Sequence, residues 1–307
     1  PHPAALLVLW AAWLERCRVL VADPAADAAL LTRWCKRASV EVLVTDRPSA
    51  LELQRDTLVI GIGPQVSAGA QEFEEWLEPH LDAEVPENTS RPEDIAVLLP
   101  TSGSTGEPKL VALDQRSLCS SAATLVGRFD WSAGRLLSLG PLHMMSGLRN
   151  PAVAAPLAGA TILIPGEAER RLPLAAWETA VREEATIITT SPAWLATLLG
   201  SCGRLSPSPA VAQILATGAA LPAGLRERAE SALDTRVVNY YGLTETGGIC
   251  AADAPNGSHR TGVGTPCGAL LRIVDGRGQA VDPGEEGRVL VHGPQNMRGY
   301  LGAGTVE

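Results

Sequence analysis

The sequence predicts an α/β protein with two parallel-sheet, helix-covered subdomains and a small C-terminal antiparallel β subdomain. Short apolar runs such as Val40–Thr45 and Thr186–Thr190 alternate with helical patterns, as is typical of a parallel sheet covered on both faces. This alternation occurs twice, in the first third and in the middle of the chain. In the tail, the apolar runs Leu270–Val274 and Gly287–Val291 are separated by Asp-Gly and Asp-Pro-Gly turns, which indicates antiparallel hairpins.

The individual elements follow from these patterns in chain order. Helical patterns are expected at residues 4–16, 27–37, 71–81, 114–129, 172–184, 191–199 and 223–232, and Asp114 is a candidate N-cap of the fourth of these helices. Strand-like runs are expected at residues 18–22, 40–45, 57–62, 95–99, 135–140, 161–164, 186–190, 211–216, 237–240, 270–274 and 287–291. The polar stretch Pro86–Glu93 indicates a linker. We therefore predict a first α/β subdomain at 1–93, a second at 94–260 and a small β subdomain at 261–307.

Bulk properties limit the class of protein. A chain of 307 residues with 46% hydrophobic and 19% charged residues can form a large core. A net charge of -9 argues against a protein that binds nucleic acid through broad electrostatic attraction. The six cysteines form no CxxC pair, which favours buried thiols in a reducing, cytoplasmic compartment over a disulfide framework or zinc site. The apolar stretch Pro3–Leu14 is too short to span a bilayer, so no membrane span is expected.

The first motif that carries chemistry is Thr101–Lys109, which reads TSGSTGEPK and follows the apolar run Ile95–Leu99. Its glycines allow sharp turns and let backbone amides approach a ligand closely. Its hydroxyls add donors and Lys109 adds a mobile positive charge, so the parts suit a polyphosphate. The spacing differs from a Walker loop, which has four residues between its glycines. The alternative is a flexible surface loop between a strand and a helix.

The second motif is Asn239–Gly247, which reads NYYGLTETG and follows a strand-like run. Open α/β sheets bind ligands beyond the carboxyl ends of their strands, so this position suits a binding site. Glu245 offers the carboxylate oxygens that Mg²⁺ prefers, and Thr244 offers a hydroxyl to a phosphate. The alternative is a strand end with two core tyrosines and an exposed Glu-Thr turn.

Together, TSGSTGEPK and YGLTET resemble the two signatures of the adenylate-forming enzymes: acyl-CoA synthetases, nonribosomal peptide synthetase adenylation domains and luciferases. The resemblance runs from about Ala4 to Tyr300, because residues 262–266, 284–288 and 298–300 are similar to later structural motifs of that family. It implies that ATP activates a carboxylic acid to an acyl-AMP with release of pyrophosphate. The acyl group would then pass to CoA or to a carrier-protein thiol. ATP and Mg²⁺ are thus implied, with an acyl carrier protein as one candidate partner.

The resemblance also assigns roles residue by residue. Lys109 belongs to the loop that holds the β- and γ-phosphates, Thr244 matches the threonine at the α-phosphate, and Glu245 matches the Mg²⁺ ligand. Tyr241 matches the aromatic residue that stacks on adenine, and Asn239 matches the residue at its amino edge. The implied ATP-binding set is Thr101, Ser102, Gly103, Ser104, Thr105, Gly106, Lys109, Gly218, Ala219, Ala220, Asn239, Tyr240, Tyr241, Gly242 and Thr244.

The stretch Pro141–Gly147 (PLHMMSG) resembles the acid-pocket segment of the family. The implied substrate-binding residues are His143, Met144, Gly218 and Gly242; for His143, the alternative is a packed core histidine. Amino-acid-activating domains tend to carry an aspartate in this region, and residues 141–150 contain none. An acid without an α-amine is therefore favoured, and an amino-acid adenylation domain is the alternative. Arg149 could meet a second substrate carboxylate, or be solvated or salt-bridged.

Three later features of the family are not found before Glu307: a YRTGD-like stretch, a hinge, and a small mobile C-terminal domain with a catalytic lysine. The family's first strands also precede anything like Pro1. We therefore expect these residues to correspond to the large N-terminal core, to bind ATP or an acyl-AMP, and to turn over poorly by themselves. The alternative from another class is a non-catalytic nucleotide-binding module that keeps the fold.

Overall fold

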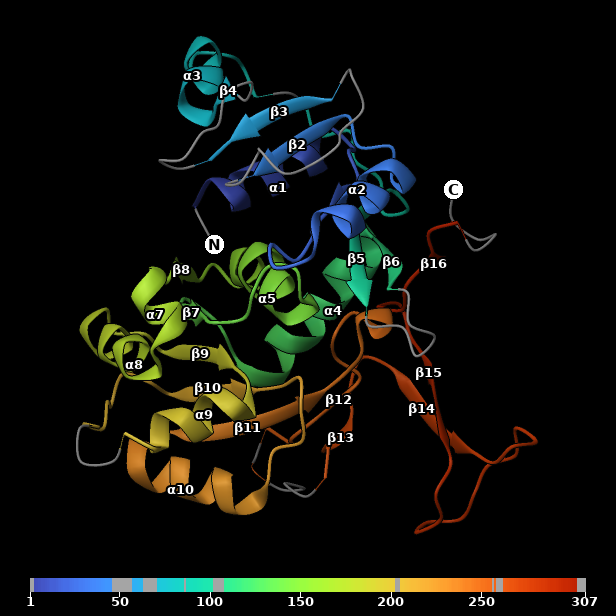
Figure 1. The fold of residues 1–307 in the computed structure, drawn as a ribbon. Coiled ribbons are helices and arrows are strands. Elements are labelled where there is room, and N and C mark those ends of the chain that lie inside the picture. The colour runs from blue at the N-terminus through green and yellow to red at the C-terminus, as the bar shows by residue number, and fades with distance from the viewer. Residues whose placement is uncertain are drawn as a thin grey trace. The chain divides into compact units, whose positions relative to one another are not determined.

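The computed structural model describes residues 3–45, 57–62, 71–85, 87–101, 108–201, 205–255, 257 and 262–302. The chain consists of two compact units (Figure 1). The N-terminal unit comprises His2–Ala112 and Gly299–Glu307, and the central unit comprises Leu113–Arg298. The subdomain boundaries expected at 93/94 and 260/261 stay predictions.

The central unit is built on a seven-stranded sheet with the order β13-β12-β11-β10-β9-β7-β8. Its strands are β7 (Arg135–Ser138), β8 (Thr161–Leu163), β9 (Ile187–Thr190), β10 (Gln213–Ala216), β11 (Arg236–Tyr241), β12 (Ala251–Ala252) and β13 (Thr265–Pro266). Strands β8, β7, β9, β10 and β11 are parallel, whereas β12 and β13 add an antiparallel edge. The carboxyl ends of the five parallel strands therefore lie at one edge of the sheet.

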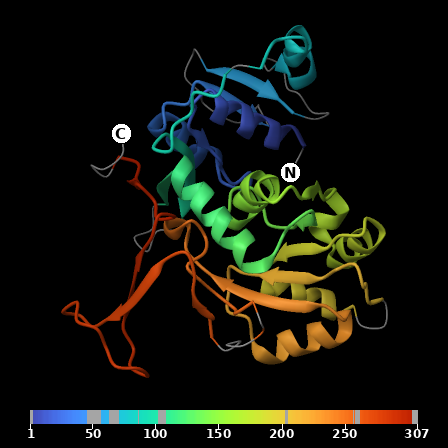
Figure 2. The same cartoon turned by 180° about the vertical axis from the view of Figure 1, so that it is seen from behind.

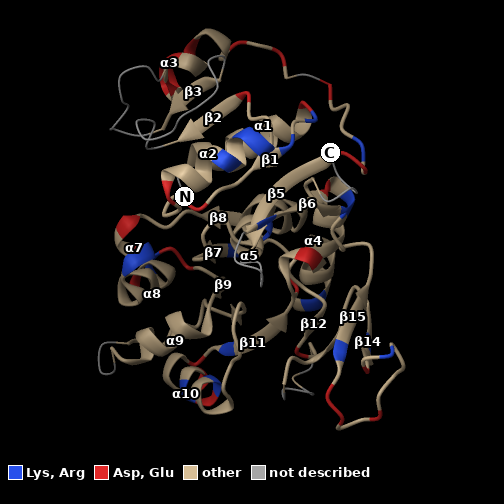
Figure 3. Ribbon diagram, turned by 45° about the vertical axis from the view of Figure 1, so that its right-hand side comes forward, with Lys and Arg blue, Asp and Glu red and all other residues tan. Residues whose placement is uncertain are grey.

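Helices connect these strands. They are α4 (Gln115–Phe129), α5 (Met145–Arg149), the π-helix η3 (Asn150–Ala154), α6 (Ala155–Leu157), α7 (Glu167–Arg171), α8 (Pro173–Arg182), α9 (Pro192–Leu199), α10 (Ala223–Leu233) and the 3₁₀ turn η4 (Thr244–Thr246). The charged residues of the helices are of both signs, as α7 shows in blue and red (Figure 3).

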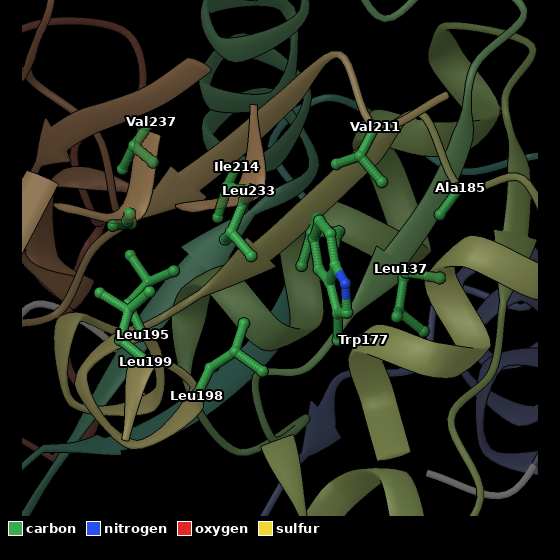
Figure 4. Packing of buried hydrophobic residues seen from close by; sticks show 14 of the residues in the cluster. Leu137, Trp177, Ala185, Leu195, Leu198, Leu199, Val211, Ile214, Leu233 and Val237 are labelled. Atoms are coloured by element: carbon green, nitrogen blue, oxygen red, sulfur yellow. The ribbon is translucent and has the colours of Figure 1, made fainter. Parts of the chain in front are cut away.

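Successive residues of the parallel strands enter two different cores, because side chains alternate across a strand. One core packs α8, α9 and α10 on the first face, around the fully buried Trp177 (Figure 4). The strand residues on this face are Leu137, Ile188, Ile214, Ala216 and Val237. The second core packs α4 and α6 on the other face, and its strand residues are Leu136, Ile187, Leu215, Val238 and Tyr240. Burial on both faces explains why these strands read as continuous apolar runs.

Side-chain caps set where several helices begin. Asp114 accepts a hydrogen bond from the Ser117 amide at 2.7 Å, as the sequence predicted for the start of α4. Ser191 does the same for Trp194 at the start of α9. In the N-terminal unit, Asp27 caps α2 through the Leu30 amide at 2.8 Å.

The N-terminal unit contains two small sheets. Its elements are α1 (Pro3–Leu14), β1 (Val19–Leu20), α2 (Ala28–Arg37), β2 (Val42–Thr45), β3 (Leu58–Gly61), β4 (Gln71–Glu72), α3 (Phe73–Leu77), η2 (Glu78–His80), β5 (Ile95–Thr101), β6 (Lys109–Asp114, ending in the central unit) and β16 (Gly299–Tyr300). One sheet has the order β1-β5-β6-β16, and the other is the parallel set β2-β3-β4. Helix α2 covers the first sheet through Trp34, and Ala4 of α1 packs on the second beside Ile60.

The tail of the central unit forms the predicted antiparallel pair. Strands β14 (Leu270–Val274) and β15 (Arg288–His292) pair over five residues, and in Figure 2 they extend as a long red hairpin. This hairpin, together with the two helix-covered parallel sheets, confirms the predicted fold class.

Three segments differ from the expectation. Residues 109–114, which follow the phosphate-loop motif, form strand β6 next to β5, so the motif joins two neighbouring strands and not a strand and a helix. Residues 145–157, where the sequence predicted no element, are helical and include Pro151 and Pro156. The helix expected at 71–81 begins with two strand residues, because Gln71 and Glu72 pair with β3.

Among the described residues, no helix combines the length and apolar character needed to cross a membrane.

Candidate functional site

Four loops leave the parallel strands of the central unit at the same edge of the sheet. They follow β7, β9, β10 and β11, and strand register holds their starting points level: Ser138 lies opposite Thr189, and Ala216 lies opposite both Thr190 and Asn239. Hydrogen bonds continue beyond the strands, from the Leu139 amide to the Thr189 carbonyl at 3.0 Å. The fold therefore brings the acid-pocket segment, the turn Thr217–Ala220 (TGAA) and the YGLTET motif to one edge, where open α/β sheets bind ligands.

The acid-pocket segment Pro141–Gly147 closes on itself. A Cβ on Gly147 would lie 2.0 Å from the Pro141 carbonyl oxygen, and a Cβ on Gly140 would lie 3.0 Å from the Gly147 Cα atom. The contact at Gly147 leaves no space for a side chain, and the contact at Gly140 is tight, so the two ends of the loop lie against each other through backbone. Within the loop His143 is partly exposed and the Met144 side chain is 48% exposed. Both candidate substrate residues thus lie on an accessible loop at the sheet edge.

The turn after β10 contains Thr217 and Gly218. The Thr217 hydroxyl donates to the Tyr240 carbonyl at 2.9 Å, and the Thr217 amide donates to the Thr190 carbonyl at 3.1 Å. Gly218 has a φ of +87°, a left-handed conformation that favours glycine, and it is exposed together with Ala219 and Ala220. The backbone of this turn is therefore anchored on two strands and open to a ligand.

The three residues that end β11 have different surroundings. The Asn239 amide donates to Asp253 Oδ2 at 2.7 Å, and its Nδ2 donates to the Gly262 carbonyl at 3.2 Å. The Tyr240 ring is buried in the core, and only its backbone reaches the loop edge. Tyr241 is partly exposed. An aromatic face for a base is therefore offered by Tyr241 and not by Tyr240.

Residues 242–248 form a compact turn that presents Thr244 and Glu245. A Cβ on Gly242 would lie 2.3 Å from the Gly248 carbonyl carbon, so the two ends of the turn touch through backbone. The Thr246 hydroxyl accepts from the Leu243 amide at 2.9 Å, and the Glu245 carbonyl accepts from the Met297 amide at 2.8 Å. Thr244 and Glu245 are both partly exposed. Hydrogen bonds within the turn and from Met297 thus hold its backbone, while Thr244 and Glu245 keep part of their surface exposed.

The donor set at this turn fits a magnesium ion that is held mainly by a substrate. Glu245 supplies a partly exposed carboxylate, and no group of three or more His, Cys, Asp or Glu side chains with metal-ligand geometry occurs in the part of the chain that the structure describes. Mg²⁺ usually keeps several waters and binds through one or two carboxylates and substrate phosphates. A single glutamate is therefore compatible with Mg²⁺.

The phosphate-loop motif belongs to the N-terminal unit. Residues Ser102–Glu107, which include the candidate residues Ser102, Gly103, Ser104, Thr105 and Gly106, lie outside the described residues. Thr101 ends β5, and Lys109 begins β6 as an exposed residue. The Lys109 Nζ atom lies 4.8 Å from the centre of the Tyr300 ring, a cation–π contact that holds the ammonium group above an aromatic face.

Two buried arginines behind the sheet edge were missed or misjudged from the sequence. Arg226 forms an ion pair with Asp253 at 3.0 Å, and both side chains are more than 90% buried. Arg149 was expected to be solvated, salt-bridged or facing substrate, but its side chain is fully buried and bonded to neutral oxygens. The sequence around either arginine gives no sign that the side chain is buried. The partners Gly247 and Asp253 come from distant segments.

Comparisons with known proteins identify the family. The AMP-binding enzyme family matches residues 1–301, so the chain belongs to this family. It is 30% identical over 233 residues to the indoleacetate–CoA ligase of Aromatoleum aromaticum, covering 74% of this chain and 45% of that protein. It is 28% identical over 288 residues to the probable nonribosomal peptide synthetase CymA of Salinispora arenicola, covering 91% of this chain and 4% of that protein.

A solved structure shares the fold. The anthranilate CoA ligase AuaEII, in complex with anthranoyl-AMP, superposes with a TM-score of 0.84 at 22% sequence identity, over 93% of this chain and 57% of that one. The match of the AMP-binding enzyme family to residues 1–301 confirms the predicted family. The chain spans less than half the length of the two relatives named above.

Proposed function

We propose that this chain is the nucleotide- and acid-binding core of an enzyme that activates a carboxylic acid with ATP. The reaction joins the acid carboxylate to the α-phosphorus of ATP, forming an acyl-AMP and releasing pyrophosphate. The observation that carries the proposal is the shared sheet edge: the strands that precede the acid-pocket segment, the turn Thr217–Ala220 and the Thr244–Glu245 turn are parallel, and their ends are level in register. Membership of the AMP-binding enzyme family supports it.

The chemistry needs two anions to be brought together, so catalysis depends on positioning and charge neutralisation. We assign the adenine face to Tyr241, its amino edge to Asn239, and the α-phosphate to the Thr244 hydroxyl. Glu245 would hold Mg²⁺, which supplies positive charge to the phosphates when bound. The loop Thr101–Lys109 would hold the β- and γ-phosphates, with Lys109 as its charged member. None of these roles needs a strong base, because a carboxylate is already nucleophilic at neutral pH.

The substrate that we favour is an acid without an α-amine. The segment 141–150 carries no aspartate to hold an α-ammonium group. Its only ionisable side chains are His143 and Arg149, and Arg149 is buried. Transfer of the acyl group to CoA or to a carrier-protein thiol would follow in the whole enzyme. The likeness to CymA makes amino-acid adenylation the second candidate.

A pyrophosphate-exchange assay tests the function. The whole enzyme that contains this chain is supplied with ATP, Mg²⁺, and a panel of aryl, acyl and amino acids. Exchange with an aryl or acyl acid is the expected result, and exchange only with amino acids would transfer the assignment to the second candidate. Calorimetric titration with a non-hydrolysable acyl-AMP mimic separates both from a non-catalytic module, which would bind ATP but gain nothing from the acyl group.

A further inference from the structure

Arg149 is a fully buried cation that forms no ion pair with a carboxylate among the residues that the structure describes. It lies at the end of α5, and its side chain makes every recorded hydrogen bond to a neutral oxygen. Nε and Nη2 donate to Asn150 Oδ1 at 3.0 and 2.8 Å, Nη1 donates to the Gly247 carbonyl at 3.1 Å, and Nη2 donates to the Tyr240 hydroxyl at 3.4 Å. Its guanidinium carbon lies 5.5 Å from the centre of the Tyr240 ring.

Such a residue is costly for the fold. Burial lowers the pKa of the Arg149 guanidinium, because the charged form loses its hydration. An apolar side chain of similar volume would fill the same space without that cost, and such replacements of buried charges are often neutral or stabilising. A gain in stability therefore does not explain the buried guanidinium well. The hydrogen bonds that it donates to neighbouring segments explain it better.

The donors of Arg149 connect the acid-pocket helix to the turn that carries Glu245. Arg149 belongs to α5, which begins within the segment Pro141–Gly147. Its Nη1 bond ends on Gly247, two residues beyond Glu245, where Gly247 and Gly248 have φ values of +64° and +81°. A Cβ on Gly248 would lie 2.7 Å from Met145 Cγ, so the same helix also packs directly against the turn.

We propose that Arg149 is a positioning residue that fixes the Thr244–Gly248 turn against α5. The hydrogen bond from Arg149 Nη1 to the Gly247 carbonyl fixes the end of this turn. The backbone of the turn then determines the directions of the Thr244 and Glu245 side chains. This inference rests on the proposed function and adds to it a link between the acid-pocket segment and the metal-binding turn. In-line attack on the α-phosphate tolerates little error, since a misplacement of about 1 Å can cost about a hundredfold in rate.

Steady-state exchange kinetics of Arg149→Met and Arg149→Lys in the whole enzyme test the proposal. Arg149→Met removes the donors and the charge but keeps a flexible side chain. We expect kcat to fall about a hundredfold while the KM for ATP changes less than threefold, because the turn is displaced and the adenine site is not. Arg149→Lys keeps one donor for Gly247 and should recover part of kcat. An unchanged kcat in Arg149→Met would overturn the proposal.

Arg128→Met is the matched control. Arg128 also donates to neutral oxygens, the carbonyls of Asp253 and Ala252 and the hydroxyl of Thr265, and none of these three bonds reaches the turn. It should lose stability with kcat retained. Equal losses of kcat in Arg128→Met and Arg149→Met would indicate a general structural role and count against the proposal.

Amide hydrogen exchange provides a readout that does not depend on activity. The Gly247 and Gly248 amides donate to the carbonyls of Thr244 and Leu243 at 3.1 and 2.8 Å. In Arg149→Met these amides should exchange at least tenfold faster than in the wild-type chain, and in Arg128→Met they should not. Unchanged exchange in Arg149→Met would refute the positioning role. Absence of pyrophosphate exchange in the wild-type enzyme would instead refute the proposed function and leave this comparison intact.

Discussion

Glycines at the ends of the loops decide the geometry of this site. Gly147 and Gly242 both have φ values that other residues tolerate, so their conformations alone do not require glycine. They are required because another backbone segment occupies the position of a Cβ, at 2.0 Å for Gly147 and 2.3 Å for Gly242. The sequence marks both positions within motifs, but only the fold shows that the constraint is backbone contact.

Gly147→Ala tests this constraint. The new methyl group would overlap the Pro141 carbonyl, so we expect a loss of about 1–3 kcal/mol in unfolding free energy, as for overpacking elsewhere. Gly127→Ala is the control, because its Cβ would meet nothing within 4 Å on the exposed side of α4. There a gain of about 0.5–1 kcal/mol is expected from helix propensity. Urea denaturation of both variants measures the difference, and a neutral Gly147→Ala would contradict the closed loop.

Glu245→Ala tests the metal-binding role at the same scale. Removal of one preorganised electrostatic group typically costs about 3 kcal/mol in the transition state, or about a hundredfold in kcat. We expect that loss in Mg²⁺-dependent pyrophosphate exchange by the whole enzyme. The backbone bond from Met297 to the Glu245 carbonyl does not involve the side chain, so the fold should survive. Wild-type exchange in this variant would remove Glu245 from the site.

At the scale of elements, helix α4 illustrates how a single cap can be read from sequence. Asp114 is 1% exposed, and its Oδ1 accepts from the amide and the hydroxyl of Ser117 at 2.7 and 2.5 Å. The aspartate immediately before an apolar helical pattern predicted this role, because the first turn of a helix has unpaired amides.

Asp114→Ala should lower the unfolding free energy by about 1–2 kcal/mol, which is the usual range for loss of a capping side chain. We expect a loss of about 2 kcal/mol, the upper end of this range, because the substitution leaves the buried Ser117 amide without its acceptor. Asp27→Ala provides the comparison, since the Asp27 cap of α2 is exposed and should cost about 0.5–1 kcal/mol. Thermal denaturation followed by circular dichroism measures both; equal losses would show that burial of the cap has no effect.

Most elements could be predicted because their apolar runs are long and bounded by turn residues. Two elements could not. Residues 110–113 read LVAL, but their position after a glycine-rich loop left no pattern to distinguish strand from lead-in to α4. For residues 145–157 no element was predicted, because Pro151 and Pro156 interrupt any helical pattern. The structure accommodates Pro151 in a π-helical turn, where the Ala155 amide donates to the Asn150 carbonyl five residues earlier.

At the scale of the whole molecule, a partly buried thiol contributes to the response to alkaline pH. Burial raises the pKa of Cys267 to about 11 from its ordinary value of 9.0. The unfolded chain therefore releases this proton first, and above pH 9 the folded state binds more protons than the unfolded state. By linkage, stability is full below pH 9 and falls as pH rises toward 11.

Cys267→Ser should flatten this decline. We expect the wild-type chain to lose more unfolding free energy than the variant between pH 9 and pH 11, with the two curves parallel at neutral pH. Urea midpoints measured across this range provide the test. Parallel curves over the whole range would show that the Cys267 thiol titrates normally.

The sequence by itself determined the α/β class, the family resemblance and the places of the phosphate loop and the YGLTET motif, because these depend on local patterns. Candidate roles for Lys109, Thr244, Glu245 and Tyr241 stay predictions that the proposed experiments address. Only the tertiary structure decided that Arg149 is buried against Gly247 and that Arg226 pairs with Asp253. These contacts join residues that are 98 and 27 positions apart. No local pattern encodes such pairs, since strand register and helix packing bring their partners together.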